Sequence, residues 1–313
     1  MEVDIRDYLY KEKQQKIKEF RKNSLIDMHT HTIYSDGELT PNELISYAVK
    51  NNVGTLSITD HDTITGIKNI SYGYGYGVTD DTEYVRIIPG VELTAKVDKG
   101  LMHILGYGID INNKELNNKL SQIKDSNINY IILLLAQINK DYGIKFIDDD
   151  IKKLFKKPGN LGRPDIARLC IEYSYSNSVQ DAFNKYLVSS YDKLRNYKEI
   201  LTYNECIKVI VNSGGIPVLA HPKSLKLSDE ELKKLIENMI KIGLKGIEVY
   251  HSSHNEIEQK KYLNIAKEYN LLISGGSDYH GKNTKPDVEI GTGVNNNLYI
   301  KRLSLLKQLK KDY

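Results

Sequence analysis

The chain alternates between apolar, strand-like runs and polar segments with helical periodicity. An apolar run ends at Asp27-Met28-His29, and Thr40-Pro41-Asn42-Glu43 then provides an N-cap and a proline typical of a helix start. Further strand-like runs lie at 54–59, 84–93, 101–108, 215–220, 245–250 and 271–275. Helix-period segments at 203–212, 229–241 and 255–269 lead into the last three of these runs. This order is typical of an α/β fold with a parallel sheet, open or closed into a barrel.

Two stretches depart from the alternation. Residues 1–23 form a charged lead-in without an apolar run, and residues 110–201 contain helix-period segments only. We therefore expect residues 24–109 and 202–313 to form the α/β domain, with 110–201 as a helical insertion. The patch SYGYGYG at 71–77 has the alternating glycine of a flexible loop, and aromatic stacking on a ligand is the less favoured interpretation.

Composition narrows the class of function. A chain of 313 residues fits one large domain with an insertion, or two domains, better than many small modules. The 44 basic and 41 acidic residues give a net charge of only +3, which favours neither tight binding of long nucleic acid nor a membrane surface. Cys170 and Cys206 lack the C-x-x-C spacing of a thiolate zinc site, and the chain has no apolar run long enough for a signal or membrane segment. We expect a cytoplasmic protein, and the oligomeric state stays open.

Histidines and carboxylates gather where the apolar runs meet loops. His29 and His31 project to the same side if their segment is extended, so both imidazoles can reach one ion. Asp36 follows in a tight turn, and His61 ends the next strand between two aspartates. Imidazole and carboxylate are the ligands of divalent transition metals, and a barrel collects residues at its strand ends. This pattern predicts a multinuclear metal centre.

The second half of the pattern strengthens this prediction. Glu92 closes an apolar strand, where a buried acid needs a cation, a metal or a proton, although a salt-bridged structural glutamate is the alternative. His103 begins another apolar strand, where a lone histidine is more often a hydrogen-bonded core residue. The remaining candidates are His221, Asp278 and His280, which also follow apolar runs.

Together these motifs closely resemble the polymerase and histidinol phosphatase (PHP) superfamily of metal-dependent phosphoesterases. In the family's order they are His29-Thr30-His31, Ser35-Asp36-Gly37, Thr59-Asp60-His61-Asp62, Gly90-Val91-Glu92, the segment 103–107, Ala220-His221-Pro222 and the segment 276–280. GRPDIA at 162–167 and GIEV at 246–249 further resemble the branch of nucleoside 3′,5′-bisphosphate phosphatases and the related 5′-to-3′ exoribonuclease. The likeness spans about 24–281 and is weakest across the helical insertion.

The resemblance implies a distorted (β/α)7 barrel of the PHP type with up to three divalent metal ions. It implies one site of His29, His31, Glu92 and Asp278, a second of Glu92, His103 and His221, and a third of Asp36, His61 and His280. Glu92 would bridge two ions. Mixed nitrogen and oxygen ligation suits manganese, iron or zinc, of which we expect manganese.

Such a centre predicts phosphoester hydrolysis by a metal-bridging hydroxide, without a serine or cysteine nucleophile. The residues expected to act through the metals are His29, His31, Glu92 and Asp278. Arg163 is suited to a bidentate phosphate contact, although a structural surface role is open. His254 is a candidate phosphate contact or acid for the leaving oxygen, Lys223 a further phosphate contact, and structural roles are open for both. His251 is the weaker candidate of the H-x-x-H pair.

We expect the substrate to be a nucleoside 3′,5′-bisphosphate or a short 5′-phosphorylated oligonucleotide. A small phosphomonoesterase of the histidinol phosphate type shares the ligand set and remains an alternative. So do an amide-hydrolysing metalloenzyme and a non-catalytic module whose metals only brace the fold. Many relatives carry a histidine where this chain has Asp165, a departure that bears on any substrate contact there.

Overall fold

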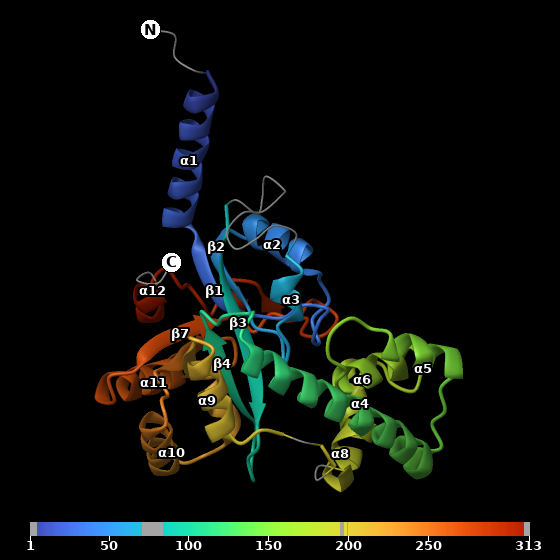
Figure 1. Ribbon diagram of the computed structural model, residues 1–313. Helices are drawn as coiled ribbons and strands as arrows, with labels where there is room; N and C mark the ends of the chain where they lie inside the picture. The colour runs from blue at the N-terminus through green and yellow to red at the C-terminus, as the bar shows by residue number, and fades with distance from the viewer. Residues whose placement is uncertain (1–4, 71–83, 195–196, 199, 310–313) are drawn as a thin grey trace.

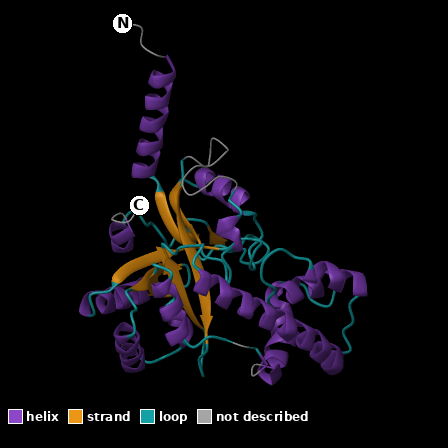
Figure 2. Ribbon diagram, in the orientation of Figure 1, coloured by secondary structure: helices purple, strands orange, loops and turns teal. Residues whose placement is uncertain are grey.

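The computed structural model describes residues 5–70, 84–194, 197–198 and 200–309, so the 71–77 patch lies outside the described residues. Its centre is a seven-stranded sheet, coloured orange in Figure 2. The strands are β1 (Leu25–Thr30), β2 (Val53–Ile58), β3 (Arg86–Ala95), β4 (Met102–Tyr107), β5 (Ile216–Leu219), β6 (Gly246–His251) and β7 (Leu272–Gly276). A short hairpin of β8 (Val288–Glu289) and β9 (Gly293–Val294) follows.

Helices surround this sheet (Figure 1). Those of the barrel are α2 (Pro41–Lys50), α3 (Thr65–Lys68), α9 (Tyr203–Asn212), α10 (Asp229–Lys241), α11 (Glu256–Glu268) and α12 (Ser304–Leu309), with the 3-10 helix η3 (Pro222–Leu225) after β5. The predicted start of α2 is present, because Thr40 Oγ1 accepts a hydrogen bond from the Glu43 amide and Glu43 accepts one from the Thr40 amide. Leu44, Ile210 and Ile247 belong to the core between these helices and the sheet. The apolar faces of the strands pack in this core and hold the strands in place. The polar residues at the strand ends are therefore available to form a site.

The sheet is mixed rather than fully parallel. The pairs β1–β2, β2–β3, β5–β6 and β6–β7 are parallel, whereas β4 is antiparallel to both β3 and β5. The parallel sheet predicted from the sequence is wrong at β4. Residues 96–101 connect β3 to β4, and a parallel crossover needs a dozen or more residues.

Contacts between β1 and β7 nearly close the sheet into a barrel. Thr30 forms a bridge with Tyr279, just beyond the end of β7. The buried Asp27 carboxylate accepts hydrogen bonds from the backbone amides of Ser277 and Gly291, each at 2.8 Å. A Cβ at Gly276 would lie only 2.6 Å from Cβ of His29, so glycine permits this approach. Closure brings the histidines that follow β1 beside the aspartate that follows β7.

The charged lead-in forms a helix, α1 (Ile5–Asn23), which the sequence analysis did not predict. Figure 1 shows α1 projecting away from the barrel. Near its C-terminal end, Ile17 is buried and Arg21 Nε donates to the Tyr84 carbonyl at 3.0 Å. Its lysines, glutamates and glutamines are strong helix formers, but the helix has no apolar stripe. Hydrophobic periodicity therefore does not reveal it.

The segment between β4 and β5 is helical, as predicted. It contains α4 (Lys114–Tyr142), α5 (Asp148–Phe155), α6 (Arg163–Glu172), α7 (Val179–Ala182), the π-helix η1 (Phe183–Leu187) and α8 (Val188–Leu194). Ile131, Ile166 and Leu187 belong to a core separate from that of the barrel. The π-helix η1 lies directly between α7 and α8, and π-helical turns of this kind are often found at functional sites. None of the described helices combines the length and apolar character needed to cross a bilayer.

Candidate metal centre

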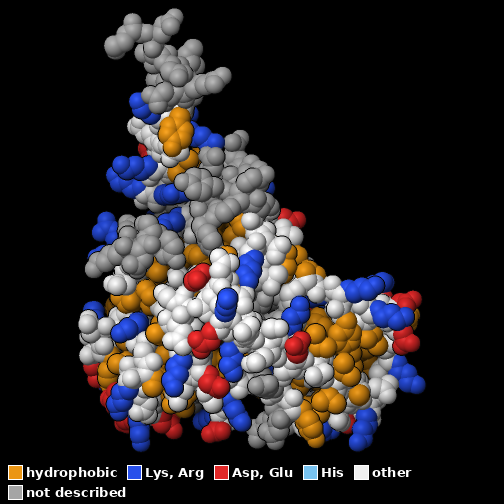
Figure 3. Space-filling view, in the orientation of Figure 1, with side chains coloured by type: hydrophobic (Ala, Val, Ile, Leu, Met, Phe, Trp, Pro, Cys, Tyr) orange, Lys and Arg blue, Asp and Glu red, His pale blue; other side chains and the backbone are white. Residues whose placement is uncertain are grey.

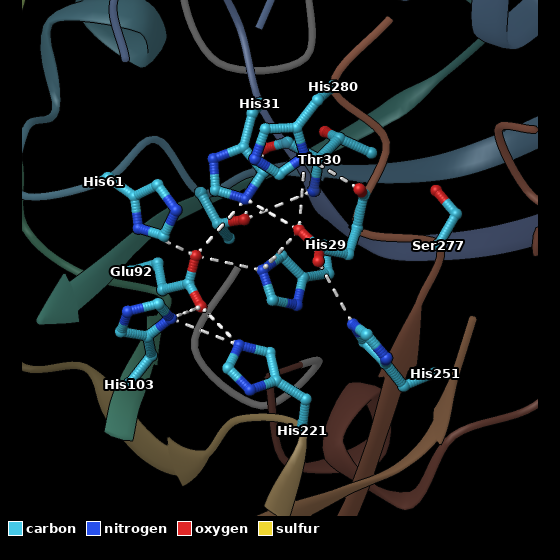
Figure 4. Close-up of polar contacts among 12 residues, drawn as sticks. His29, Thr30, His31, His61, Glu92, His103, His221, His251, Ser277 and His280 are labelled. Atoms are coloured by element: carbon cyan, nitrogen blue, oxygen red, sulfur yellow. Dashed lines mark hydrogen bonds and ion pairs between the residues drawn. The ribbon is translucent and has the colours of Figure 1, made fainter. Parts of the chain in front are cut away.

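One buried carboxylate occupies the middle of the candidate site (Figure 4). Glu92 on β3 has no exposed surface. Its Oε2 lies 3.1 Å from His29 Nε2, 3.2 Å from His31 Nε2 and 3.1 Å from His61 Nδ1. Its Oε1 lies 2.9 Å from His103 Nδ1 and 3.0 Å from His221 Nε2. The two oxygens thus face different groups of imidazoles, as a bridging carboxylate requires.

The donor atoms around Glu92 fit metal ions. Among the described residues, the buried atoms without a hydrogen-bond partner include His29 Nε2, His31 Nε2, His61 Nδ1, Asp36 Oδ1 and Glu92 Oε2. The nitrogens lie close to carboxylate oxygens but not in hydrogen-bonding geometry. Unpaired buried polar atoms are costly, and divalent cations would satisfy nitrogen and oxygen lone pairs together.

The structure brings the first predicted ligand set together. The donor atoms of His29, His31, Glu92 and Asp278 all lie within 4.8 Å of one another. Asp278 Oδ1 is 3.5 Å from His29 Nε2 and 3.2 Å from His31 Nε2. These residues come from β1, β3 and the end of β7, so the closed barrel assembles the set.

The other two predicted sets are also gathered. His103 Nδ1 and His221 Nε2 lie 3.2 Å apart beside the same Glu92 oxygen. On the other side, Asp36, His61 and His280 form a group with His31 whose donor atoms lie within 4.8 Å of one another. Asp36 Oδ1 is 3.1 Å from His280 Nε2, and Asp36 Oδ2 is 3.9 Å from His61 Nε2.

Unusual backbone conformations occur at these strand ends. His221 has φ of 20°, Asp278 has φ of 58°, and Asp62 beside His61 has φ of 54°. Positive φ is uncommon for residues other than glycine, and strained residues of this kind cluster at functional sites. The chain therefore adopts sharp turns where the candidate ligands lie.

The aspartates flanking His61 hold the loops rather than joining the donor groups. Asp60 accepts hydrogen bonds from the Thr32 amide at 2.7 Å and from Ser35 Oγ at 2.6 Å. Asp62 accepts from the Thr94 amide at 2.8 Å and from Thr94 Oγ1 at 2.9 Å. These carboxylates fix His61 and the loop that carries Asp36.

Two residues outside the predicted ligand sets support His29 and Asp278. Glu248 on β6 is fully buried, and its Oε1 lies 2.9 Å from His29 Nδ1, while its Oε2 accepts from the His221 amide at 2.7 Å. A partner on the second imidazole nitrogen orients a metal-binding histidine. His251 Nε2 lies 3.3 Å from Asp278 Oδ2, so the residue ranked as the weaker histidine lies directly beside the centre. The position of His251 at the end of an apolar strand was the feature of the sequence that could have identified it.

Lys285 is a site residue that the sequence analysis missed. Its Nζ lies 2.5 Å from Asp278 Oδ2, on the oxygen that also faces His251. Burial lowers the pKa of the lysine, but Asp278 outweighs burial and raises the pKa above its ordinary value. Lys285 lies in a loop, without the strand-end position that singles out the histidines, so no local pattern marks it.

Burial disfavours charge throughout the centre, but neighbouring groups reverse its effect at some positions. Desolvation lowers the pKa of His31, yet Asp278, Glu92 and Asp36 together raise that pKa to about 9. At His61 desolvation prevails and lowers the pKa to about 3. The surrounding imidazoles hold the pKa of Glu92 well below its usual value despite burial. In the metal-free protein, His31 is therefore protonated at neutral pH and must release this proton to bind a metal.

Arg163 begins α6 in the helical segment beside the centre. Its guanidinium carbon lies 4.2 Å from the ring centre of Tyr191. Asn160, just before it, donates to the carbonyl of Asp62 at 2.7 Å, which attaches this part of the insertion to the His61 loop. Asp165, at the position where many relatives have histidine, is 2.6 Å from Lys157 Nζ and 3.1 Å from Arg168 Nη1. Its carboxylate is therefore used within the insertion.

The other predicted substrate contacts have structural partners. Lys223 Nζ donates to the Ser253 carbonyl at 2.9 Å and lies 2.9 Å from Glu258 Oε1. His254 is fully buried, and its Nδ1 lies 2.9 Å from the Val249 carbonyl, to which it must donate. Burial and then His251 lower the pKa of His254 to about 4. A neutral ring of this tautomer has a lone pair at Nε2, so this atom accepts a proton rather than supplies one.

Comparisons with known proteins agree with this geometry. Residues 27–252 match the PHP domain family. The 5′-3′ exoribonuclease Rnm of Escherichia coli (strain K12) is 31% identical over 269 residues, which cover 85% of this chain and 88% of that protein. The 3′,5′-nucleoside bisphosphate phosphatase of Chromobacterium violaceum is 27% identical over 255 residues, covering 82% and 87%. A solved structure from Bifidobacterium adolescentis, described as a metal-dependent phosphoesterase, has a TM-score of 0.72 at 26% identity and covers 91% of this chain and 95% of its own.

The nearly closed barrel, its buried nitrogen and oxygen donors and these relatives define a metal-dependent phosphoesterase. Within that class, the chain belongs to the PHP domain family. The resemblance inferred from the motifs is confirmed, including its relation to the exoribonuclease and bisphosphate phosphatase branch.

Proposed function

We propose that this phosphoesterase hydrolyses nucleoside 3′,5′-bisphosphates or short 5′-phosphorylated oligonucleotides. The observation that carries the proposal is the buried Glu92 carboxylate between unpaired imidazoles, with Arg163 on the adjoining insertion. The names of two relatives that align over most of this chain, an exoribonuclease and a nucleoside bisphosphate phosphatase, support the substrate class.

The proposed centre holds up to three divalent ions, with manganese as the expected metal and iron or zinc as alternatives. The proposed sets are His29, His31, Glu92 and Asp278, then Glu92, His103 and His221, then Asp36, His61 and His280. The mixed nitrogen and oxygen donors favour these metals over calcium or magnesium, which prefer oxygen ligands alone.

The ions, when bound, would supply an activated water and neutralise charge on the phosphoryl group. The protein's own contribution is orientation. Glu248 fixes the His29 ring, while Asp60 fixes the loop that carries Asp36. Arg163 offers a planar, permanently charged group that can bind two phosphate oxygens at once. With these groups preorganised, the proposed reaction needs no covalent intermediate on the protein.

The proposed substrates are small. Figure 3 shows acidic and basic side chains interspersed over the visible face, in keeping with the net charge of +3. Such a surface supports short nucleotides over long nucleic acid. In the proposed organisation, residues 24–109 and 202–313 form the metal-dependent barrel and residues 110–201 form the insertion that completes the substrate pocket. The proposed location is the cytoplasm, where Cys170 and Cys206 would stay reduced.

The test is phosphate release from adenosine 3′,5′-bisphosphate by purified protein of known metal content, with and without added Mn²⁺. We expect hydrolysis that requires metal and exceeds hydrolysis of histidinol phosphate, with a 5′-phosphorylated RNA trimer as the third substrate. Replacing His29 and His31 together by alanine should abolish hydrolysis. Lys233→Met is the matched control, because its Nζ pairs with Glu268 at 2.7 Å on the outer surface.

Two outcomes would contradict the proposal. Full activity of the double alanine variant would reject the metal centre as the site of reaction. Turnover of histidinol phosphate well above that of both nucleotide substrates would assign the chain to small phosphomonoesters instead.

A further inference from the structure

A second group of charged and aromatic side chains lies in the insertion, outside the metal donors. Arg163 begins α6, Tyr130 is on α4, Tyr191 is on α8, and Lys198 follows α8. The Arg163 guanidinium lies 4.2 Å from the Tyr191 ring centre, the Tyr191 and Tyr130 rings are 6.3 Å apart, and Lys198 Nζ is 5.9 Å from the Tyr130 ring centre. Figure 1 shows α4, α6 and α8 converging in this part of the molecule. The four side chains therefore form one continuous cluster.

The two cations of this cluster have no carboxylate partner among the described residues. Neither Arg163 nor Lys198 forms an ion pair within 4.0 Å there, whereas Lys157, Arg168 and Lys193 of the same insertion all do. Asp62 is the acid whose charge acts most strongly on Lys198, but both of its oxygens already accept hydrogen bonds from Thr94. Among the described residues, neither cation therefore has a carboxylate within ion-pair distance, and Asp62 acts on Lys198 only from farther away.

The hydroxyl of Tyr130, in the same cluster, also lacks a partner among the described residues. Tyr130 is 3% exposed, and its hydroxyl is buried without a hydrogen-bond partner in the described part of the chain. A buried phenol normally has a partner, because an unsatisfied hydroxyl is costly. Two half-buried cations and an unpaired donor, supported by aromatic rings, are the groups that a phosphate would satisfy together.

Electrostatics support the same interpretation. Burial lowers the pKa of Lys198 most, the Asp62 carboxylate raises it in part, and the Arg163 charge adds a smaller lowering. Arg163 and Lys198 therefore repel each other, and a bound anion would relieve that repulsion.

This cluster adjoins the metal centre. Asn160, three positions before Arg163, donates to the carbonyls of His61 at 3.2 Å and Asp62 at 2.7 Å. Asp62, Thr94 and Lys198 also lie around one narrow gap, so Lys198 is adjacent to the loop that carries His61.

We propose that Arg163, Lys198 and the Tyr130 hydroxyl form an anion subsite for the second phosphate of the substrate, the one that is not hydrolysed. This inference rests on the proposed nucleotide phosphoesterase function and names the groups that select a bisphosphate over a monophosphate. Lys198, rather than Lys223 or His254, is then the partner of Arg163. Tyr191 supports the guanidinium by stacking, which limits its rotation.

The test compares kcat/KM for adenosine 3′,5′-bisphosphate and adenosine 5′-monophosphate in wild type, Arg163→Met, Lys198→Met and Tyr130→Phe, all loaded with Mn²⁺. A hydrogen bond to a charged group contributes enough that losing one lowers binding by roughly 10- to 100-fold. We expect Lys198→Met and Arg163→Met each to lower the bisphosphate value by that factor more than the monophosphate value. Lys193→Met is the control, because its Nζ pairs with Asp141 at 2.8 Å on the exposed side of α8.

Tyr130→Phe separates binding from folding. It removes only the unpaired hydroxyl, so we expect an unchanged or higher Tm together with weaker binding of adenosine 3′,5′-bisphosphate to metal-free protein in calorimetric titration. Unchanged discrimination in all three variants, with wild type active, would overturn the subsite while the proposed function stands. If wild type loaded with manganese, iron or zinc releases no phosphate from either nucleotide, the proposed function fails and the subsite with it.

Discussion

Nδ1 of His29 lies 2.9 Å from Oε1 of Glu248, and both side chains are fully buried. This contact leaves Nε2 of His29 facing Glu92 and Asp278. Desolvation raises the pKa of Glu248, but the imidazoles of His29 and His251 outweigh it and lower the pKa to about 2. Although desolvation lowers the pKa of His29, Glu92, Glu248 and Asp278 raise it well above its usual value, so a metal must displace the Nε2 proton. The ionised Glu248 then keeps the remaining proton on Nδ1.

Glu248→Ala should therefore weaken metal binding by roughly 10- to 100-fold, since outer partners of ligating histidines contribute about this much. Calorimetric titration of metal-free protein with Mn²⁺ measures the effect. Glu237→Gln is the control, because this exposed glutamate only accepts from Tyr269 at 2.9 Å. Wild-type affinity in Glu248→Ala would show that the contact does not orient the ligand.

The metal-free protein should be most stable near pH 6.5. The pKa of His31 is raised to about 9, so its contribution to stability is complete below its unfolded value of about 6.5 and disappears as the pH rises to 9. The pKa of His61 is lowered to about 3, so its burial costs stability as the pH falls from about 6.5 toward 3. Thermal unfolding of metal-free protein between pH 4 and 9 tests this.

Bound metal should remove the loss of stability that we expect for the metal-free protein between pH 6.5 and 9. Because His31 must lose its proton to coordinate, the apparent affinity for Mn²⁺ should rise with pH from 6 to about 9. Titration in buffers of different ionisation enthalpy should reveal proton release at neutral pH. A pH-independent affinity without proton release would contradict the electrostatic account.

Lys285→Met should produce opposite effects on metal and substrate. Removing a cation that lies 2.5 Å from Asp278 Oδ2 reduces its repulsion of bound metal, so we expect metal affinity to rise by roughly three- to tenfold, a modest factor because Lys285 is partly exposed. The same change removes a positive charge near the phosphate, so kcat/KM should fall. Lys282→Met is the control, because this neighbouring lysine pairs with Glu289 at 2.5 Å. A parallel loss of metal and activity would instead indicate that Lys285 only holds Asp278 in place.

Gly276→Ala should destabilise the barrel by about 3 kcal/mol or more, since its Cβ would meet His29 at a point where neither strand can move easily. Urea unfolding followed by circular dichroism measures the free energy of unfolding. Gly143→Ala is the control, because no atom lies within 4 Å of its added Cβ and only its φ of 69° opposes the change. We expect that control to cost about 1 kcal/mol. Equal losses in the two variants would mean that close approach of β1 and β7 does not limit stability.

Much of the centre was predictable because its signals are local. The H-x-H of His29 and His31, the carboxylate Glu92 in an apolar strand and the motif around Asp278 are each visible within a few residues. The strand at 102–107 was also visible, but its direction was predicted wrongly, although the short connection at 96–101 already excludes a parallel crossover from the preceding strand. Its second neighbour, β5, lies beyond the whole insertion and could not be inferred from adjacent residues. Helix α1 was missed because its helix-forming residues carry no apolar period.

The order of residues along the chain is enough to specify the chemistry: side chains that bind transition metals lie where apolar strands end, in the order of one phosphoesterase family. Which of these side chains meet depends on the folded chain. Glu92 faces His221 across 129 positions, Glu248 faces His29 across 219, and Lys198 approaches Tyr130 from another helical segment. Periodicity and motifs report neighbours along the chain, whereas these contacts depend on closure of the barrel and docking of the insertion, which many distant residues determine together.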